Sequence, residues 1–531
     1  MTARAVMVLG TSSHAGKSLL TLALCRIFAR QGHRVAPFKS QNMSLNSAAT
    51  PEGLEIGRAQ ALQAEAAGIP PSVHMNPILL KPAGRMTSQV IVHGKIWGRL
   101  SAAEYHLRRV EELLPLVRES YQKLAADHDV IVLEGAGSPA EINLKQHDIV
   151  NMRMAELADA SCLLVGDIDR GGVFASLLGT VQLLEPEERA RIQGFVINKF
   201  RGDVSLLAPG IRTMEDRIEK PCLGVVSYLE DLSLDEEDSL GLPGSDSNHD
   251  AQWSIPGQHR PLRVAVIGFP SLSNFTDFDA LRSEPSVAVR FCRKPTHLGD
   301  ADVIILPGSK QTADDLLWMR SQGLDKAITR HAKTGLIAGI CGGMQMLGQL
   351  ISDPEQIESK GSIRGLSVLP INTTMRSSKV SIASGGRLAS GSLFSQPARN
   401  VSLNGYEIHV GETSYLGQAQ PFAQLVRRSV ERTETVTDGC ISPDSRIFGT
   451  YLHGLFDGDA FRHLFIEAAR AFCHLTPAKE FNHWESKRHE SLDRLATVVS
   501  QSLDMAKIFA WVGLRYQNQP APETSEEGRR R

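Results

Sequence analysis

A short apolar run that ends on a cysteine between glycines restricts how this chain can fold. Leu336–Ile340 has the composition of a buried strand, and Met344–Leu350 has that of a helix. Gly342 and Gly343 lie between them and allow a sharp turn that a side chain would block. A strand, a tight turn with a nucleophile and a helix together make a nucleophile elbow. The sequence therefore predicts that Cys341 lies at the N-terminus of a helix, at the tip of a buried strand.

The position of Cys341 suits nucleophilic catalysis. A helix N-terminus favours the thiolate through its dipole and its free backbone N–H groups. The same N–H groups can bind an oxyanion after the sulfur has attacked a carbonyl. The alternative is a buried structural cysteine, because free cysteines are among the most buried residues. The strand, the glycines and the helix start favour the nucleophile, and we predict that Cys341 is catalytic.

The motif Gly339-x-Cys341-x-Gly343-x-Gln345 resembles the glutaminase elbow of class I, or triad, glutamine amidotransferases. In that family the cysteine attacks the side-chain amide of glutamine and releases ammonia, which implies glutamine as the nitrogen donor here. A proline-glycine turn in the family donates a backbone N–H to the oxyanion, and Gly308 matches it. The resemblance thus implies Gly308 and Gly342 as oxyanion donors, although Gly308 could instead belong to a simple strand-end turn.

A histidine is the expected partner of the nucleophile, because it can take up and return a proton near neutral pH. Of the 17 histidines, His453 ends an apolar strand and precedes a glycine, which resembles the catalytic Tyr-x-His-Gly segment of the family. His409 is the rival, and we interpret it as a packing residue. Many family members carry a carboxylate two residues after the histidine, where this chain has Leu455. A Cys–His dyad or a carboxylate from elsewhere is therefore implied, and Glu407 is one option.

The N-terminal residues predict a phosphate-binding loop. A buried strand is expected over Arg4–Gly10 and a helix over Leu19–Arg30, with Gly16-Lys17-Ser18 just before the helix. Backbone N–H groups of such a loop cradle phosphate, Lys17 would reach the terminal phosphates, and Ser18 would ligate Mg²⁺. The spacing departs from the strict motif, because Thr11 stands where the first glycine is expected and the nearest glycine is Gly10. A chance sequence at a helix cap is the alternative, but the flanking elements favour a variant P-loop.

Alternating strands and helices predict a parallel sheet in each half of the chain. Polar residues follow some strands of the first half, and ligands bind at these carboxyl ends in such sheets. Carboxylates there suit Mg²⁺, and we predict Glu134 and Asp167 as ligands; Asp169 could equally cap a helix. The expected strands are 35–39, 90–93, 130–134, 162–166 and 194–198, then 263–269, 287–292, 303–306 and 336–340; the expected helices include 102–126, 312–333, 461–473 and 492–508.

The first half resembles the ATP-binding amidoligase domain shared by dethiobiotin synthetase and the enzymes that amidate cobyrinic acid. The P-loop of that group also has five residues between its two glycines, as from Gly10 to Gly16 here. The resemblance implies that Glu134 serves Mg²⁺ and that Asn198 contacts adenine. It also implies that residues 37–46 face the substrate and phosphates, with Lys39 stabilising charge; a solvated strand end is the alternative for Lys39.

Composition limits the remaining possibilities. A chain of 531 residues is expected to form several domains. Its formal charge of −2 gives no reason to expect nucleic acid or a membrane surface as a partner. Seven cysteines without a CxxC pair favour a reducing cytoplasm over a disulfide framework or a zinc site. We expect a P-loop NTPase-like domain over 1–232, a linker over 233–261, a class I amidotransferase α/β domain over 262–510, and a disordered tail over 511–531.

A phosphate site and a glutaminase elbow on one chain suggest that ATP activates a carboxylate which ammonia then attacks. The order of the motifs is similar to the corrinoid-amidating members of the family. This implies ATP, Mg²⁺ and glutamine as cosubstrates and a corrinoid acceptor, amidated at the b, d, e and g carboxylates of adenosylcobyrinic acid a,c-diamide. A homo-oligomer is compatible with the sequence. The alternatives are an a,c-diamide synthase, or a P-loop regulatory ATPase with a non-catalytic glutaminase-like module.

Overall fold

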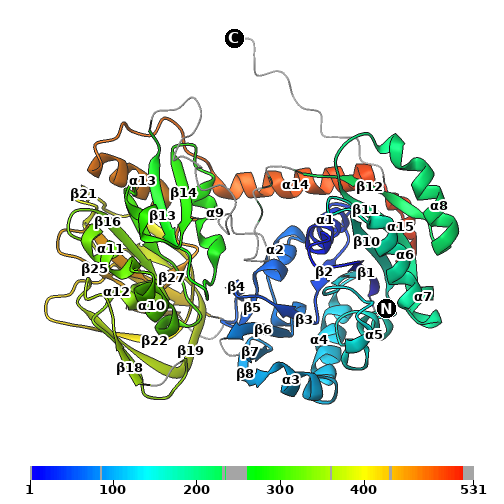
Figure 1. The fold of residues 1–531 in the computed structure, drawn as a ribbon, viewed down its shortest axis with the longest axis horizontal. Helices are drawn as coiled ribbons and strands as arrows, with labels where there is room; N and C mark the ends of the chain where they lie inside the picture. The colour runs from blue at the N-terminus through cyan, green and yellow to red at the C-terminus, as the bar shows by residue number, and fades with distance from the viewer. Residues whose placement is uncertain are drawn as a thin grey trace, which may run out of the picture. The chain divides into compact units, whose positions relative to one another are not determined.

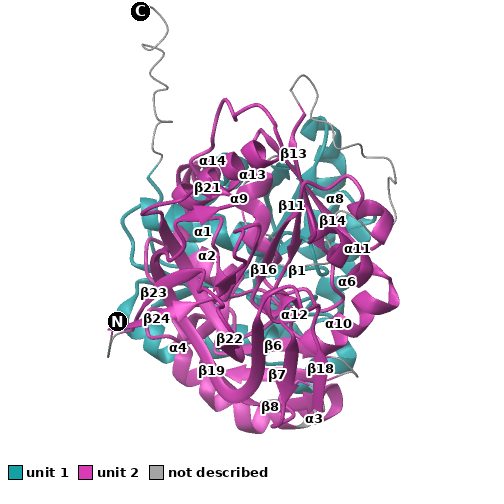
Figure 2. Ribbon diagram, turned by 90° about the vertical axis from the view of Figure 1, so that its left-hand side faces the viewer, with its two compact units in different colours: residues 1–37, 122–229, 495–531 teal, residues 38–121, 230–494 magenta. Residues whose placement is uncertain are grey.

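The computed structural model of the protein describes residues 3–83, 87–229, 232, 234, 260–358, 361–429 and 433–517. The chain forms two compact units that are interleaved in sequence, coloured separately in Figure 2: residues 1–37, 122–229 and 495–531, and residues 38–121 and 230–494. These limits differ from the single boundary expected near residues 232–262, because residues 38–121 group with the C-terminal half. Most of the expected linker, and residues 518–531 of the expected tail, lie outside the described residues.

The first unit is built on the predicted parallel sheet. Its strand order is β12-β11-β10-β1-β9-β2, and the pairings among the first five of these strands are parallel. Strands β1 and β9 are almost wholly buried, as their continuous apolar sequences require. Helix α1 packs on β1 and β9, and α6 packs on β10 (Figure 1). The strands are β1 (Arg4–Gly10), β2 (Val35–Phe38), β9 (Val130–Glu134), β10 (Ser161–Asp167), β11 (Ile192–Phe200) and β12 (Cys222–Ser227); the helices are α1 (Lys17–Arg30), α5 (Met152–Leu157), α6 (Val173–Leu183), α7 (Pro186–Arg191) and α8 (Ala208–Ile218).

One predicted strand was assigned to the wrong sheet. The residues expected as strand 90–93 belong to β7 (Thr87–Val92), in a four-stranded sheet of the second unit with the order β3-β6-β7-β8. Strand β7 pairs antiparallel with both β6 and β8. His93 and Gly94, with φ of 47° and 76°, connect β7 to β8. Two residues suffice for a hairpin, whereas a parallel connection needs a crossover of about a dozen. The other strands of this segment are β3 (Gln41–Met43), β4 (Ser47–Ala49), β5 (Glu55–Gly57), β6 (Ile78–Ala83) and β8 (Lys95–Ser101).

The second unit also contains the predicted C-terminal sheet. Its order is β14-β13-β15-β16-β26-β25, with parallel pairing throughout except at β25. The neighbours of β16 are therefore β15 and β26, and the carboxyl ends of these three strands meet at one edge. Helices α12 and α13 pack against the sheet. The strands are β13 (Leu262–Ile267), β14 (Val287–Cys292), β15 (Val303–Leu306), β16 (Leu336–Ile340), β25 (Cys440–Ile441) and β26 (Ile447–Thr450).

A largely antiparallel sheet accompanies it. Two long strands, β19 (Ile371–Leu388) and β22 (Ser402–Tyr415), form its centre. Strand β22 pairs with the two-residue strand β27 (Leu452–His453), which brings Tyr406 opposite His453. The remaining strands are β17 (Leu350–Asp353), β18 (Gly361–Arg364), β23 (Ala423–Arg428) and β24 (Thr433–Asp438).

The long predicted helices are present but interrupted. Residues 102–127 form α3 (Ala102–Arg108), a π-helical segment (Arg109–Leu113) and α4 (Leu114–Asp127). The helix expected over 312–333 is divided by Gly323, whose φ is 73°. Its two parts are α10 (Thr312–Ser321) and α11 (Leu324–His331); the C-terminal helices are α13 (Asp459–Phe472), α14 (Trp484–Ser502) and α15 (Met505–Trp511). Within the described part of the chain, no helix combines the length and apolarity needed to cross a membrane.

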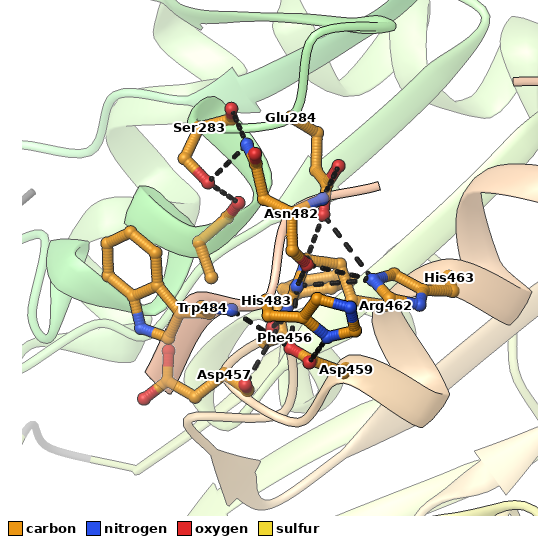
Figure 3. Close-up of polar contacts among 11 residues, drawn as sticks. Ser283, Glu284, Phe456, Asp457, Asp459, Arg462, His463, Asn482, His483 and Trp484 are labelled. Carbon is orange, nitrogen blue, oxygen red and sulfur yellow. Dashed lines mark hydrogen bonds and ion pairs between the residues drawn. The ribbon is translucent and has the colours of Figure 1, made fainter. Parts of the chain in front are cut away.

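A buried ion pair fixes the segments that flank α13 (Figure 3). The Arg462 guanidinium donates to the Glu284 carboxylate at 2.6 Å, and both side chains are fully buried. Arg462 also donates to the Phe456 carbonyl at 2.9 Å, to Asp459 at 2.7 Å and to the Asn482 carbonyl at 2.5 Å. One side chain thus connects α9 (Asp279–Arg282), the start of α13 and the segment before α14.

We expect Glu284→Ala to destabilise the second unit strongly, because it leaves the Arg462 charge buried without its main partner. Removing one member of a buried pair typically costs about 3–5 kcal/mol. Urea unfolding followed by tryptophan fluorescence would measure the loss. Arg282→Ala is the matched control, because the pair of Arg282 with Asp279 is solvent-exposed and is expected to be worth less than about 1 kcal/mol. Equal losses in the two variants would contradict this account.

Candidate active sites

Cys341 lies in a strained turn between β16 and α12 (Gly342–Leu347). Its φ of 51° and ψ of −111° are rare for a residue with a side chain, and such strain persists only where the surroundings hold it. The Cys341 N–H donates to the Thr450 carbonyl at 2.8 Å, which joins the tips of β16 and β26. A Cβ at Gly343 would collide with the Leu306 carbonyl, so only glycine fits beside β15. The predicted elbow is present, and its helix ends three residues earlier than expected.

His453 and Asp277 complete a triad with Cys341. The Asp277 carboxylate lies 2.7 Å from His453 Nδ1 and also accepts from the Gly454 N–H at 2.9 Å. The His453 side chain also interacts with that of Cys341. Because Asp277 occupies Nδ1, the imidazole has Nε2 left for exchanging a proton with the sulfur. This is the arrangement in which a histidine, oriented by a third group, activates a nucleophile.

The charges around His453 favour its protonated form. Burial of the imidazole acts against protonation, but the Asp277 carboxylate and Cys341 outweigh it and raise the pKa of His453 to about 10. Tyr406 stacks on the imidazole, with ring centroids 5.5 Å apart. The Arg58 guanidinium lies over the Tyr406 ring, 5.9 Å from its centroid, and also pairs with the Asp457 carboxylate. A protonated His453 beside Cys341 stabilises a thiolate and holds the proton that a leaving amine needs.

Asp277 is the functional residue that the sequence reasoning missed. Glu407, the residue considered for this role, instead binds the Arg427 guanidinium and lies 3.4 Å from His409 Nε2. His409 stacks on Tyr451 and contacts the Gly411 carbonyl, in agreement with its interpretation as a packing residue. Asp277 lies in the segment after β13, 176 positions before His453 in the sequence. The available signal was a single acid between Phe275 and Phe278, in a segment otherwise suited to burial.

The two predicted oxyanion donors lie beside this triad. A Cβ at Gly308 would stand 3.1 Å from His453 Cε1, so this backbone passes directly against the imidazole. Gly342 is the first residue of α12, and a Cβ there would stand 3.0 Å from the Ser309 nitrogen. The first N–H groups of a helix have no partner within it. The geometry thus brings both glycines to Cys341, and their role as donors stays a prediction.

Polar side chains from α10 and α12 lie beside the elbow. Gln345, the last residue of the elbow motif, accepts from the Thr312 hydroxyl at 3.3 Å and donates to the Tyr451 hydroxyl at 3.3 Å. The Cys341 thiol faces the Ile408 carbonyl at 3.7 Å. These groups can bind the polar ends of a small amide substrate.

The second candidate site is the loop between β1 and α1. Lys17 is buried, and its ammonium donates to the carbonyls of Ser12 at 2.9 Å and Gly137 at 3.0 Å. A side chain at Gly10 would meet the Lys17 amine at 3.0 Å. Gly16 has a φ of 98° and caps α1. Thr11, which stands at the position of the expected first glycine of the loop, donates its N–H to the Val165 carbonyl at 2.9 Å, and this bond joins the loop to β10.

Ser18 and Glu134 form the part of this site that could hold a cation. The Ser18 hydroxyl donates to the Glu134 carboxylate at 2.8 Å, and Glu134 is buried. Mg²⁺ is commonly bound by one or two protein oxygens together with substrate phosphates. Among the described residues, no group of three or more His, Cys, Asp and Glu side chains could hold a metal by itself. The oxygen pair from Ser18 and Glu134 therefore fits Mg²⁺ that arrives with a nucleotide.

The other predicted residues of the first half have structural partners. The Asn198 amide donates to the Ala15 carbonyl at 2.9 Å, and the Asp167 carboxylate pairs with Lys199 at 2.9 Å. Asp167 is thus neutralised by a lysine, whereas Glu134 is paired with a hydroxyl. Lys39 follows β2 and belongs to the second unit, where its carbonyl accepts from the Asn76 amide at 3.0 Å.

Comparisons with known proteins match both halves of the chain. Residues 6–241 match the family model of the CobQ/CobB/MinD/ParA nucleotide binding domain, and residues 263–461 match that of the CobB/CobQ-like glutamine amidotransferase domain. The cobyric acid synthase of Thermoanaerobacter sp. (strain X514) is 47% identical over 508 residues, which cover 95% of this chain and 98% of the relative. That of Sorangium cellulosum (strain So ce56) is 49% identical over 527 residues, which cover 97% and 99%.

These matches extend over both halves of the chain and include the P-loop, Cys341, Asp277 and His453. The similarity also covers nearly the full length of each relative. The chain belongs to the cobyric acid synthase family.

Proposed function

We propose that this protein uses ATP and glutamine to amidate the b, d, e and g carboxylates of adenosylcobyrinic acid a,c-diamide, in cobalamin biosynthesis. The observation that carries the proposal is a Cys341–His453–Asp277 triad in the same chain as a P-loop, with full-length similarity to cobyric acid synthases. The triad would supply ammonia, and the P-loop would supply the energy that makes a carboxylate accept it.

The triad residues have separate roles in glutamine hydrolysis. Cys341 attacks the side-chain amide carbon, and the resulting oxyanion is stabilised by the N–H groups of Gly308 and Gly342. His453 gives its proton to the leaving ammonia and then activates the water that releases glutamate. Asp277 fixes the orientation of the imidazole and stabilises its charge.

The P-loop residues activate the acceptor. A carboxylate reacts poorly with ammonia because it would have to expel oxide, so transfer of the terminal phosphoryl group of ATP first converts it to an acyl phosphate. Lys17 stabilises the charge on the phosphates, and Ser18 and Glu134 would hold Mg²⁺, which supplies further charge neutralisation. Lys39 would be a second cation that stabilises charge in this step, Asn198 would contact adenine, and Asp167 would be a further ligand of Mg²⁺.

We expect the purified protein to convert adenosylcobyrinic acid a,c-diamide in four steps when supplied with ATP and glutamine. Each change from carboxyl to carboxamide lowers the mass by about one unit, because a hydroxyl is replaced by an amino group, so mass spectrometry can count the steps. Conversion of cobyrinic acid only as far as its diamide would instead identify an a,c-diamide synthase.

Cys341→Ser is expected to abolish the use of glutamine, because serine lacks the nucleophilicity of a thiolate at neutral pH. Ammonium salts should still support amidation, since the phosphate site is untouched. Glutamate release and corrinoid amidation would be measured in parallel. Loss of both activities in a folded variant would contradict two separable sites, and Cys440→Ser is a control that replaces a buried cysteine outside the triad.

Asp277→Asn should lower glutaminase kcat by about 10²–10⁴-fold, because the imidazole loses its orienting carboxylate. Asp277 raises the pKa of His453, so its removal should lower this pKa and move the alkaline loss of activity from near pH 10 to lower pH. Glutamate release measured across pH would show this. If the variant lost glutaminase activity at the same alkaline pH as the wild-type protein, Asp277 would not control the pKa of His453.

A further inference from the structure

Two reciprocal hydrogen bonds join residues 46–47 to the segment that carries Asp277. The Ser47 N–H donates to the Asn274 side-chain oxygen at 2.9 Å, and the Phe275 N–H donates to the Asn46 side-chain oxygen at 3.1 Å. Both bonds are buried and lie within the second compact unit, although the residues are more than two hundred positions apart in sequence. Each asparagine thus satisfies a buried backbone N–H of the other segment.

The bonded segment leads directly to the triad. Asn274 has a φ of 51° and precedes the 3₁₀ turn Phe275–Phe278, whose third residue is Asp277. The Asp277 N–H donates to the Asn274 carbonyl at 3.0 Å. A shift of Asn274 or Phe275 therefore displaces the backbone that sets the distance between Asp277 and His453. Strained residues of this kind keep their conformation only when their neighbours fix it.

A second buried contact connects the same region with the cysteine side of the triad. Lys81 donates to Ser47 at 2.8 Å and to Glu55 at 2.5 Å, and the second oxygen of Glu55 binds the Lys379 ammonium. Lys379 belongs to β19, which pairs with β22, and the Ile408 carbonyl of β22 faces the Cys341 thiol at 3.7 Å. Ser47 thus takes part in both contacts, because its N–H donates to Asn274 and its hydroxyl accepts from Lys81. Buried charges need their partners in place, so these residues hold a defined arrangement.

We propose that Asn46 and Asn274 are positioning residues of the glutaminase triad, which is therefore assembled jointly by the segment after β2 and the C-terminal sheet. Asn46 is the last residue of the segment 37–46, which is proposed above to face the acceptor. A displacement of this segment would change the geometry of Asp277 and His453, so that glutamine hydrolysis responds to the state of the acceptor segment. The inference rests on the proposed function of the triad.

The test compares Asn46→Ala and Asn274→Gly with the wild-type protein. Glycine accepts the positive φ of Asn274, so this variant removes the hydrogen bond without adding backbone strain. We expect glutaminase kcat to fall about tenfold in each variant, with KM for glutamine little changed. The alkaline limb should move to lower pH by about one pH unit, because Asp277 supports the His453 charge less well. Ammonia-dependent amidation should persist in Asn274→Gly, which also shows that this variant is folded.

Asn482→Ala is the matched control. Its side-chain amide also joins distant segments of the second unit, by donating to the Ser283 carbonyl, but it makes no contact with Asp277. This variant should lose stability and keep the wild-type pH profile. An unchanged alkaline limb in both Asn46→Ala and Asn274→Gly, or an equal shift in Asn482→Ala, would overturn the inference. Absence of glutamine hydrolysis in the wild-type protein would refute the proposed function itself.

Discussion

The buried bond between Asp277 and His453 is the interaction on which the C-terminal site depends. Burial in an apolar interior disfavours a charged imidazole, and the Asp277 carboxylate, together with Cys341, keeps the charge there. Cys341 follows β16, His453 lies in β27, just after the neighbouring strand β26, and Asp277 comes from the turn after β13. The ends of these elements therefore set the distances between the three side chains, and the buried Asp277 carboxylate helps to keep the His453 imidazole protonated.

The two sites use the same architectural principle with different chemistry. In each parallel sheet a loop after a buried strand turns into a helix, and its backbone lies where a ligand can approach. Glycines are required at both turns, because Asn198 leaves no room for a side chain at Gly16 and the Leu306 carbonyl leaves none at Gly343. The first turn carries a lysine and a hydroxyl for phosphates, and the second carries a thiol for an amide.

Much of this could be predicted from the sequence, because strong local patterns decide strands, turns and the residues at their ends. The elbow at Cys341, the loop before α1, and Ser18 and Glu134 as separate candidate ligands of Mg²⁺ all follow from such patterns. Asp277 could not be assigned to His453 from the sequence, because the two residues lie 176 positions apart and the local pattern marks Asp277 only as an acid in a segment suited to burial. The grouping of residues 38–121 with the C-terminal half was missed for the same reason, since hairpin pairing and long-range contacts determine it.

The interleaving of the two units limits how such an enzyme could be divided between two genes. A break between residues 242 and 262 would look harmless, because this interval separates the two matched domains. It would nevertheless place Glu55 and Lys379 on different polypeptides. Each polypeptide would then bury a charge without its counterion unless the two polypeptides stayed bound to each other. Natural or engineered two-chain versions would therefore need to retain a tight, polar interface at these residues.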